Sequence, residues 1–166
     1  RHAPGTIGKA LPGNDIRLLG DDGEVVPDGR VGELYVKNKM LVAGYHGDEA
    51  ATKGSMREGY FSVGDLARRD ARGCFHIEGR KRDMIISGGV NIYPAEIESV
   101  LIQMPGVRDC AVFGIPDEEF GEQICAHVEL LTGATLDAGQ VRGHLGERLA
   151  RYKVPKVVEF SVALPR

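Results

Sequence analysis

The sequence predicts an α+β fold in two parts, a small β-rich, barrel-like part followed by an α+β sandwich. Two observations support this prediction. Up to Gly79, glycine and proline turn signals divide the chain into short alternating or apolar runs, which are typical of small antiparallel sheets. After Arg82, apolar residues recur at helical spacing between longer strand-like runs, which is typical of helices that pack on a sheet.

Turn signals such as Asp21-Asp22-Gly23 separate the expected strands of the first part. The runs between these turns are about five to seven residues long, the usual length of strands in antiparallel sheets. One short helix is expected near residues 49–53. The expected strands are residues 15–19, 32–38 and 74–78.

The second part opens with an expected short strand at residues 83–87. The pair Gly88-Gly89 follows it and allows a tight turn or a close approach of the backbone to a ligand. Pro94 suits the first turn of a helix, which should end before Pro105. The apolar positions of this helix are Ile97, Val100, Leu101 and Met104.

A second helix is expected after Asp137, which with Gln140 occupies capping-box positions. The order of elements is helix, strand, strand, helix, strand, and it predicts that both helices cover one face of the sheet. The apolar positions of the second helix are Val141, Leu145 and Leu149, and the strands are residues 107–115, 123–131 and 157–160.

Composition excludes several classes of protein. The 166 residues carry a net charge of -3, with 21 Lys and Arg against 24 Asp and Glu and no basic stripe, which argues against DNA or RNA binding. No apolar run is long enough to cross a bilayer, so a cytoplasmic protein without a membrane span is expected. The five histidines show no metal-ligand spacing and predict no metal site. Three dispersed cysteines, Cys74, Cys110 and Cys125, predict reduced core thiols.

Residues 79–98 contain, in this order, charged residues, an apolar strand, a glycine pair and a helix that begins with proline. This segment resembles the linker and the start of the small domain in acyl-CoA synthetases and other adenylate-forming enzymes, whose pattern is Gly-Arg-x-(Lys/Asp)-Asp-x-Ile, then Gly, then Pro-x-Glu-Ile-Glu. Residues 59–65 resemble the family's aromatic-x-x-(Thr/Ser)-Gly-Asp element, with Val63 where a hydroxyl residue is common. Residues 149–155 resemble its Leu-Ala-x-Tyr-Lys-x-Pro element. The three segments follow the family order, so the resemblance covers essentially the whole chain.

The resemblance implies that residues 1–81 are the last subdomain of a large AMP-binding domain and that residues 82–166 are a small mobile domain. It also implies a reaction. A carboxylic acid and ATP, with Mg²⁺, give an acyl-adenylate and pyrophosphate, and the coenzyme A thiol then releases AMP. The family's phosphate loop is not found in the chain, and its adenylation lysine is expected beyond Arg166. We therefore expect a chain that is cut at both ends and is inactive alone.

Asp65 matches the family aspartate that holds the ribose hydroxyls, and an ionised carboxylate can accept two hydrogen bonds from a vicinal diol. A turn cap after Gly64 is the simpler alternative. Arg80 matches the arginine that contacts ribose or phosphate, although a surface salt bridge would also explain it. Arg82 occupies the hinge position, where the family usually has Asp or Lys, and an ordinary exposed arginine is the alternative. No turn-rich linker is present there, so relative motion would be limited to a few backbone torsions.

Gly88 and Gly89 match the loop that approaches the pantetheine arm of coenzyme A through backbone groups. Glycine suits that task because a side chain would block a narrow tunnel, although a plain turn is the alternative. Asn91 is expected to help orient the same loop.

Three further residues complete the candidates, and two of them, Phe120 and Lys153, have two interpretations each. Phe120 occupies a position where the family often places an aromatic residue that stacks on the coenzyme adenine, or it packs in the core. Lys153 would meet the coenzyme's phosphates or be a solvated lysine. Glu96 is expected to cap the helix that begins at Pro94.

Two other functions stay open. The chain could belong to an adenylation domain that loads a carrier protein, although the sequence of residues 84–89 looks more like that of stand-alone CoA ligases. It could also be a non-catalytic interaction module, because an open strand edge after Phe160 would allow self-association. The sequence does not indicate which acid is activated.

Overall fold

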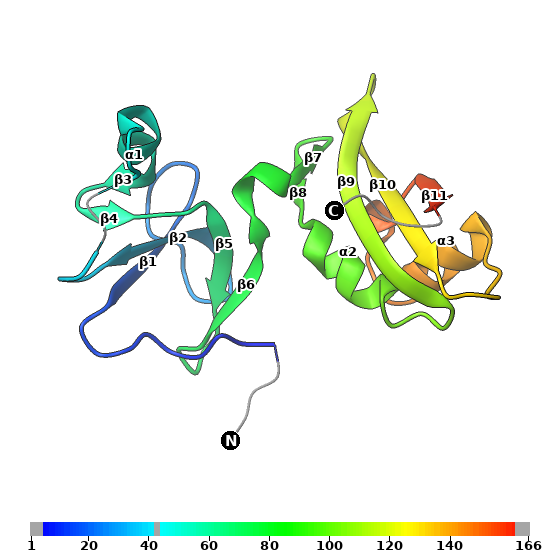
Figure 1. Ribbon diagram of the computed structural model, residues 1–166, viewed down its shortest axis with the longest axis horizontal. Helices are drawn as coiled ribbons and strands as arrows, with labels where there is room; N and C mark the ends of the chain where they lie inside the picture. Colours follow the sequence, from blue (N-terminus) through cyan, green and yellow to red (C-terminus); the bar gives the residue numbers. More distant parts are fainter. Residues whose placement is uncertain (1–4, 42–43, 162–166) are drawn as a thin grey trace. The chain divides into compact units, whose positions relative to one another are not determined.

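The computed structural model describes residues 5–41 and 44–161 (Figure 1). The chain divides into two compact units, Arg1–Arg82 and Asp83–Arg166, each with its own sheet. The division falls within a 3-10 turn, η1 (Lys81–Asp83). No helix in the described part of the chain is long and apolar enough to cross a membrane.

The first unit is built on an antiparallel sheet with β2 at its centre. One edge of β2 pairs with β1, and its other edge pairs with β5 and β4. The described strands form an open sheet rather than a closed ring. The elements are β1 (Asp15–Leu19), β2 (Val31–Lys37), α1 (Glu49–Ser55), β3 (Met56–Arg57), β4 (Tyr60–Phe61), β5 (Asp65–Arg69) and β6 (Phe75–Arg80).

Each face of this sheet carries a small apolar cluster, because successive side chains of a strand point to opposite faces. Leu18 belongs to one cluster and its neighbour Leu19 to the other. Neither cluster is large, so the first unit depends on its turns and polar contacts as well as on its core. The buried members are Leu18, Ala67 and Phe75 in one cluster and Leu19, Tyr35 and Tyr60 in the other.

The second unit is a mixed sheet with two helices. Strand β10 pairs antiparallel with β9 and β7 and parallel with β11. Both helices and the three strands that the sequence predicts after Pro105 are present. The elements are β7 (Ile85–Ser87), β8 (Val90–Ile92), α2 (Pro94–Leu101), β9 (Val107–Asp117), β10 (Gly121–Leu130), α3 (Ala138–Gly146), η2 (Arg151–Lys153) and β11 (Val157–Ser161).

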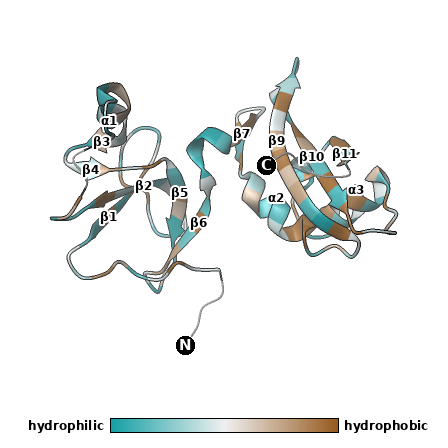
Figure 2. Ribbon diagram, in the orientation of Figure 1, coloured by the Kyte–Doolittle hydropathy of each residue, from teal (hydrophilic) through white to brown (hydrophobic). Residues whose placement is uncertain are grey.

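Both helices cover the same face of this sheet. Alternate residues of β10 face one apolar cluster, and the hydropathy of β9 and β10 varies from residue to residue along each strand (Figure 2). The expected capping box of α3 is confirmed, since Asp137 accepts from the Gln140 amide at 2.8 Å and the Gln140 side chain accepts from the Asp137 amide at 2.9 Å. The cluster includes Ile97 and Leu101 of α2, Val141 and Leu145 of α3, and Ile124, Ala126 and Val128 of β10.

The strand expected at residues 83–87 is wrong at its beginning. Residues Lys81–Asp83 form the 3-10 turn η1, and β7 begins only at Ile85. Strand β8 then returns directly after Gly88-Gly89, so the glycine pair forms the tight turn of a β-hairpin, which is one of the two roles expected for it.

Candidate functional site

Asp65 and Arg80 face each other in the first unit. Asp65 begins β5 and Arg80 ends β6, and the two residues are direct partners in the antiparallel register. Arg80 Nε lies 3.6 Å from Asp65 Oδ1, and the side chains are 52% and 30% exposed. The pair thus combines a carboxylate acceptor with a planar cationic donor at one accessible place, which suits a ribose diol next to a phosphate.

The turn before Asp65 is held by a different side chain. The Gly64 amide donates to Ser62 Oγ at 3.0 Å, and Gly64 has a φ of +82°, in the left-handed region that glycine tolerates. The turn-capping task considered for Asp65 is therefore met by Ser62. This leaves the Asp65 carboxylate beside Arg80.

Arg82 lies in η1 and is exposed. It is the last residue of the first unit, directly before the division of the chain. A hinge role for Arg82 stays a prediction.

Gly88 and Gly89 form the two-residue turn of the β7–β8 hairpin. Both have positive φ, +57° and +77°, and Ser87 pairs with Val90 across them. Two consecutive positive φ angles are the mark of a type I′ turn, which strongly favours glycine. The hairpin itself therefore requires glycine here, and contact of this turn with a ligand stays a prediction.

Phe120 lies beside this glycine turn. The Gly88 amide donates to the Phe120 carbonyl oxygen at 2.9 Å, and a Cβ added to Gly88 would lie 3.0 Å from Phe120 Cδ1. Phe120 is 38% exposed, and Lys156 Nζ lies 4.4 Å from the centroid of its ring. The fold thus brings together three residues of the predicted coenzyme site, and it adds Lys156.

Lys156 was not singled out in the sequence. The only signal for it is its place in Lys153-Val154-Pro155-Lys156, three positions after a lysine that was. Asp117 lies 3.6 Å from Lys156 Nζ and also accepts from the Phe120 amide at 2.9 Å. The Phe120 amide, followed by the Glu119 amide and Lys156, lowers the pKa of Asp117 against the opposing effect of burial. An ionised Asp117 therefore fixes the turn that presents Phe120.

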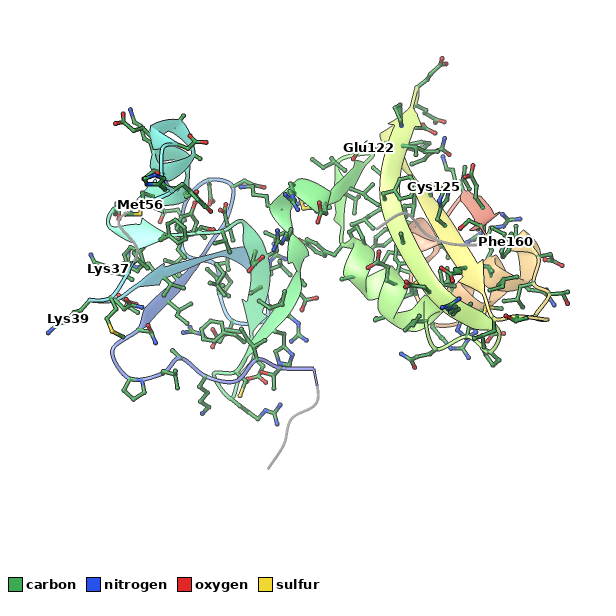
Figure 3. All side chains as sticks on the ribbon, in the orientation of Figure 1. Lys37, Lys39, Met56, Glu122, Cys125 and Phe160 are labelled. Atoms are coloured by element: carbon green, nitrogen blue, oxygen red, sulfur yellow. The ribbon has the colours of Figure 1, made fainter. Side chains whose placement is uncertain are left out.

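Glu122 ties the two hairpins of the second unit together. Its Oε2 accepts from the Ile86 amide at 2.7 Å, and it lies near the beginning of β10 (Figure 3). Asn91, expected to orient the glycine turn, is exposed on β8 opposite Ile86. Its orienting role stays a prediction.

Lys153 and Glu96 bond to each other. Lys153 Nζ donates to both carboxylate oxygens of Glu96, each at 2.6 Å. Tyr93, the residue at the N-cap of α2, makes no side-chain capping bond. Glu96 lies in the first turn of α2 as expected, and its carboxylate bonds to Lys153, so its role as a cap stays a prediction. A phosphate could reach Lys153 only in competition with Glu96.

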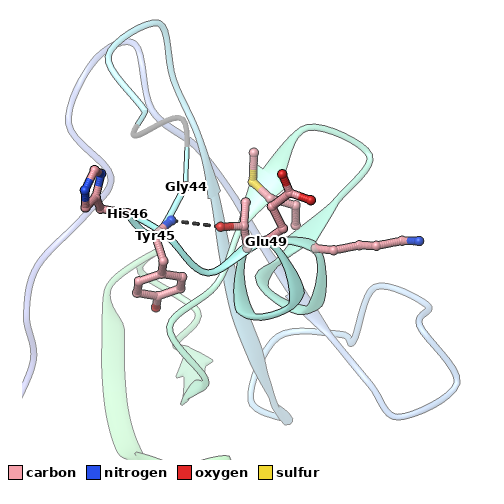
Figure 4. A pocket seen from close by; sticks show the side chains of 8 residues that line it. Gly44, Tyr45, His46 and Glu49 are labelled. Atoms are coloured by element: carbon pink, nitrogen blue, oxygen red, sulfur yellow. Dashed lines mark hydrogen bonds between the residues drawn. The ribbon is translucent and has the colours of Figure 1, made fainter.

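A pocket of about 660 Å³ lies beside α1 (Figure 4). Its wall is fixed in part by the Tyr45 amide, which donates to Thr52 Oγ1 at 2.9 Å. None of the site residues expected from the sequence lines it. Across residues 5–41 and 44–161, no three His, Cys, Asp or Glu side chains gather as a metal site would require.

Comparison with known proteins identifies the family of the chain. A family model described as AMP-binding enzyme matches residues 1–46, and one described as AMP-binding enzyme C-terminal domain matches residues 96–166. The indoleacetate–CoA ligase of Aromatoleum aromaticum is 44% identical over 162 residues, which are 98% of this chain and 32% of that protein.

Two solved structures extend the likeness. ATP-bound MatB from Rhodopseudomonas palustris matches with a TM-score of 0.91 at 44% identity, over 98% of this chain and 33% of that one. The o-succinylbenzoate–CoA synthetase MenE from Bacillus subtilis, in complex with its acyl-adenylate, matches with a TM-score of 0.91 at 36% identity. This match covers 98% of this chain and 33% of the MenE chain. The chain therefore spans about a third of the length of the relatives it matches. On its motifs, its fold and these likenesses, the chain belongs to the family of AMP-binding, adenylate-forming enzymes.

Proposed function

We propose that the chain is part of an ATP-dependent acid–CoA ligase. The observation that carries the proposal is the pairing of Asp65 with Arg80 across β5 and β6. The names of its relatives support the same reaction, since one is a CoA ligase, one binds ATP and one holds an acyl-adenylate. The proposed substrates are a carboxylic acid, ATP and coenzyme A.

In the first half-reaction, a carboxylate oxygen of the acid attacks the α-phosphorus of ATP and pyrophosphate leaves. Asp65 accepts hydrogen bonds from the ribose hydroxyls, and Arg80 donates to the ribose or a phosphate. These two residues orient the nucleotide and transfer no proton.

In the second half-reaction, the coenzyme A sulfur attacks the acyl carbon, the bond to AMP breaks, and the thiol proton is released. Gly88 and Gly89 leave the backbone unobstructed for the pantetheine arm, while Phe120 and Lys156 lie beside that turn for the nucleotide end of the coenzyme. In this proposal residues 82–166 are the mobile domain and Arg82 is its hinge. The proposed compartment is the cytoplasm, where the cysteine thiols of the chain would stay reduced.

The test is a screen for acid-dependent release of pyrophosphate by the complete polypeptide that carries these residues. Acyl-CoA formation with free coenzyme A supports the ligase. Acyl-adenylate that is consumed only by a carrier-protein pantetheine supports the loading domain instead. If no carboxylic acid stimulates pyrophosphate release, the proposal fails. The 166-residue chain alone is expected to release no AMP.

A further inference from the structure

Glu33 connects the two segments that carry Asp65 and Arg80. It lies on β2, and its Oε1 accepts from Ser62 Oγ at 2.8 Å. Its Oε2 accepts from Lys81 Nζ at 3.1 Å. Ser62 lies three positions before Asp65, and Lys81 directly follows Arg80. The Glu33 carboxylate therefore bonds to one residue in the segment of Asp65 and to one residue in the segment of Arg80.

These bonds form a closed circuit. The Gly64 amide donates to Ser62 Oγ at 3.0 Å, and the Lys81 amide donates to the Gly64 carbonyl oxygen at 2.8 Å. A displacement at any one of the four residues must therefore strain the others. The geometry of the Gly64–Asp65 turn depends on Glu33 through two side chains and two backbone amides.

Two members of this circuit, Ser62 and Glu33, are shielded from solvent, which strengthens the hydrogen bond between them. The Ser62 residue is 3% exposed and the Glu33 side chain 16%. Strand β2 is hydrogen-bonded on both edges at this point, since Glu33 pairs with Leu19 of β1 and Leu66 of β5. A charge-assisted hydrogen bond from a rigid, shielded carboxylate is stronger than an exposed one. The outer Lys81 contact with Asp21, at 3.2 Å, is more exposed and less suited to fix position.

We infer that Glu33 is a positioning residue for nucleotide binding, which fixes the Asp65 carboxylate and the end of the Arg80 strand through Ser62 and Lys81. The nucleotide part rests on the proposed function. The fixing of the turn and of the strand end rests on the geometry alone.

The test uses the Glu33→Gln variant of the 166-residue chain, with Glu78→Gln as the matched control. Glu78 pairs with Arg68 at 2.6 Å, and its side chain is 22% exposed, so the control also removes a shielded charge pair from the same sheet. Amide hydrogen exchange of Gly64 and Lys81 is measured by NMR on this chain, and the dissociation constant of AMP is measured by calorimetry on the complete polypeptide that carries the same substitution.

In Glu33→Gln we expect both amides to exchange about tenfold faster, because local opening becomes easier. We expect AMP binding about three- to tenfold weaker, because a misplaced ligand group loses hydrogen bonding. Glu78→Gln should change both quantities less than twofold. In a Lys81→Met background, Glu33→Gln should add less loss of affinity than it causes alone, because part of its effect passes through Lys81.

Unchanged exchange in Glu33→Gln would overturn the positioning role. Faster exchange with unchanged AMP affinity would overturn its nucleotide part. If the complete polypeptide that carries these residues binds no AMP, the nucleotide assignment of the proposed function fails, while the exchange result still decides whether Glu33 fixes the turn. Should Glu33→Gln fail to fold, Ser62→Ala replaces it, because loss of the Ser62 hydroxyl breaks the same circuit of hydrogen bonds. The same exchange rates and AMP affinities are then measured, with the same outcomes expected.

Discussion

Lys153 Nζ lies 2.6 Å from both carboxylate oxygens of Glu96, and so joins the first turn of α2 to the 3-10 turn η2. The Lys153 side chain is only 18% exposed, and that of Glu96 is 34%. Loss of this pair leaves a shielded charge without its partner, which costs more than loss of a surface ion pair.

We expect Glu96→Gln and Lys153→Met each to lower the free energy of unfolding of the second unit by about 1 kcal/mol. The double variant should lose less than the sum of the two single losses, because both remove one interaction. Urea unfolding of the four proteins measures this coupling. Strictly additive losses would contradict a direct contribution of the pair.

Two glycines of the second unit should respond in opposite directions to alanine. Gly88 has a φ of +57°, and an added Cβ would lie 3.0 Å from Phe120 Cδ1, so Gly88→Ala should destabilise by about 1–2 kcal/mol. Gly143 lies in the interior of α3 with open space around its added Cβ, so Gly143→Ala should stabilise by up to about 1 kcal/mol. Thermal and urea unfolding measure both. Equal effects of the two substitutions would contradict the hairpin geometry.

We expect Asp70 to make the stability of the first unit sensitive to acid. The Cys74 amide, followed by His76 and Arg72, lowers the pKa of this carboxyl well below its usual range despite opposing burial. The folded chain then binds the proton less readily than the unfolded chain, whose aspartates titrate near pH ~3.9. The stability that Asp70 contributes is complete above that pH and is lost as pH falls towards the folded pKa.

Urea midpoints of the first unit between pH 2 and 6, with Asp70→Asn for comparison, measure this contribution. The unsubstituted chain should lose stability with acid more steeply than the variant. An Asp70 carboxyl that titrates near pH ~4 in NMR spectra of the folded chain would contradict it.

The thiols should differ in reactivity. Burial, followed by Glu98 and Asp109, raises the pKa of Cys110 to about 11, and burial also raises the pKa of Cys125. Because the thiolate is the reactive form, a disulfide reagent at pH 8 should modify Cys74 first and the other two only on unfolding. Peptide mass spectrometry over time measures the order. Rapid modification of Cys125, which is 2% exposed, would show that its sheet opens readily.

Local patterns account for what the sequence predicted well. The strand expected at residues 15–19 agrees with β1 at both ends, and α3 begins directly after its predicted cap at Asp137. Strand β5 was not predicted, because only Leu66 and Ala67 are buried among its five mostly charged residues. It is a strand because β2 and β6 supply partners on both of its edges, which no local pattern records.

The same limit applies to the site. Asp65 and Arg80 were found separately from their motifs, but their pairing depends on β5, the strand that was missed. The bond between Glu96 and Lys153 spans 57 positions. The sequence had predicted a helix cap for Glu96 and, for Lys153, either a contact with the coenzyme's phosphates or a solvated side chain. Contacts that arise only when distant segments pack cannot be predicted from spacing along one segment.

The pair Asp65 and Arg80 provides the most direct test of nucleotide binding. A hydrogen bond to a charged group contributes about 1.5–3 kcal/mol, so Asp65→Asn and Arg80→Met should each weaken AMP binding by about tenfold or more. Asp28→Asn is the control, because Asp28 also pairs with an arginine of the first unit, Arg69, at 2.6 Å. Calorimetric titration of AMP into the complete polypeptide that carries each substitution gives the affinities, and the urea midpoint of each variant separates lost binding from lost folding. If Asp65→Asn binds AMP as tightly as the control does, Asp65 does not hold the ribose, and its approach to Arg80 is an ordinary surface ion pair.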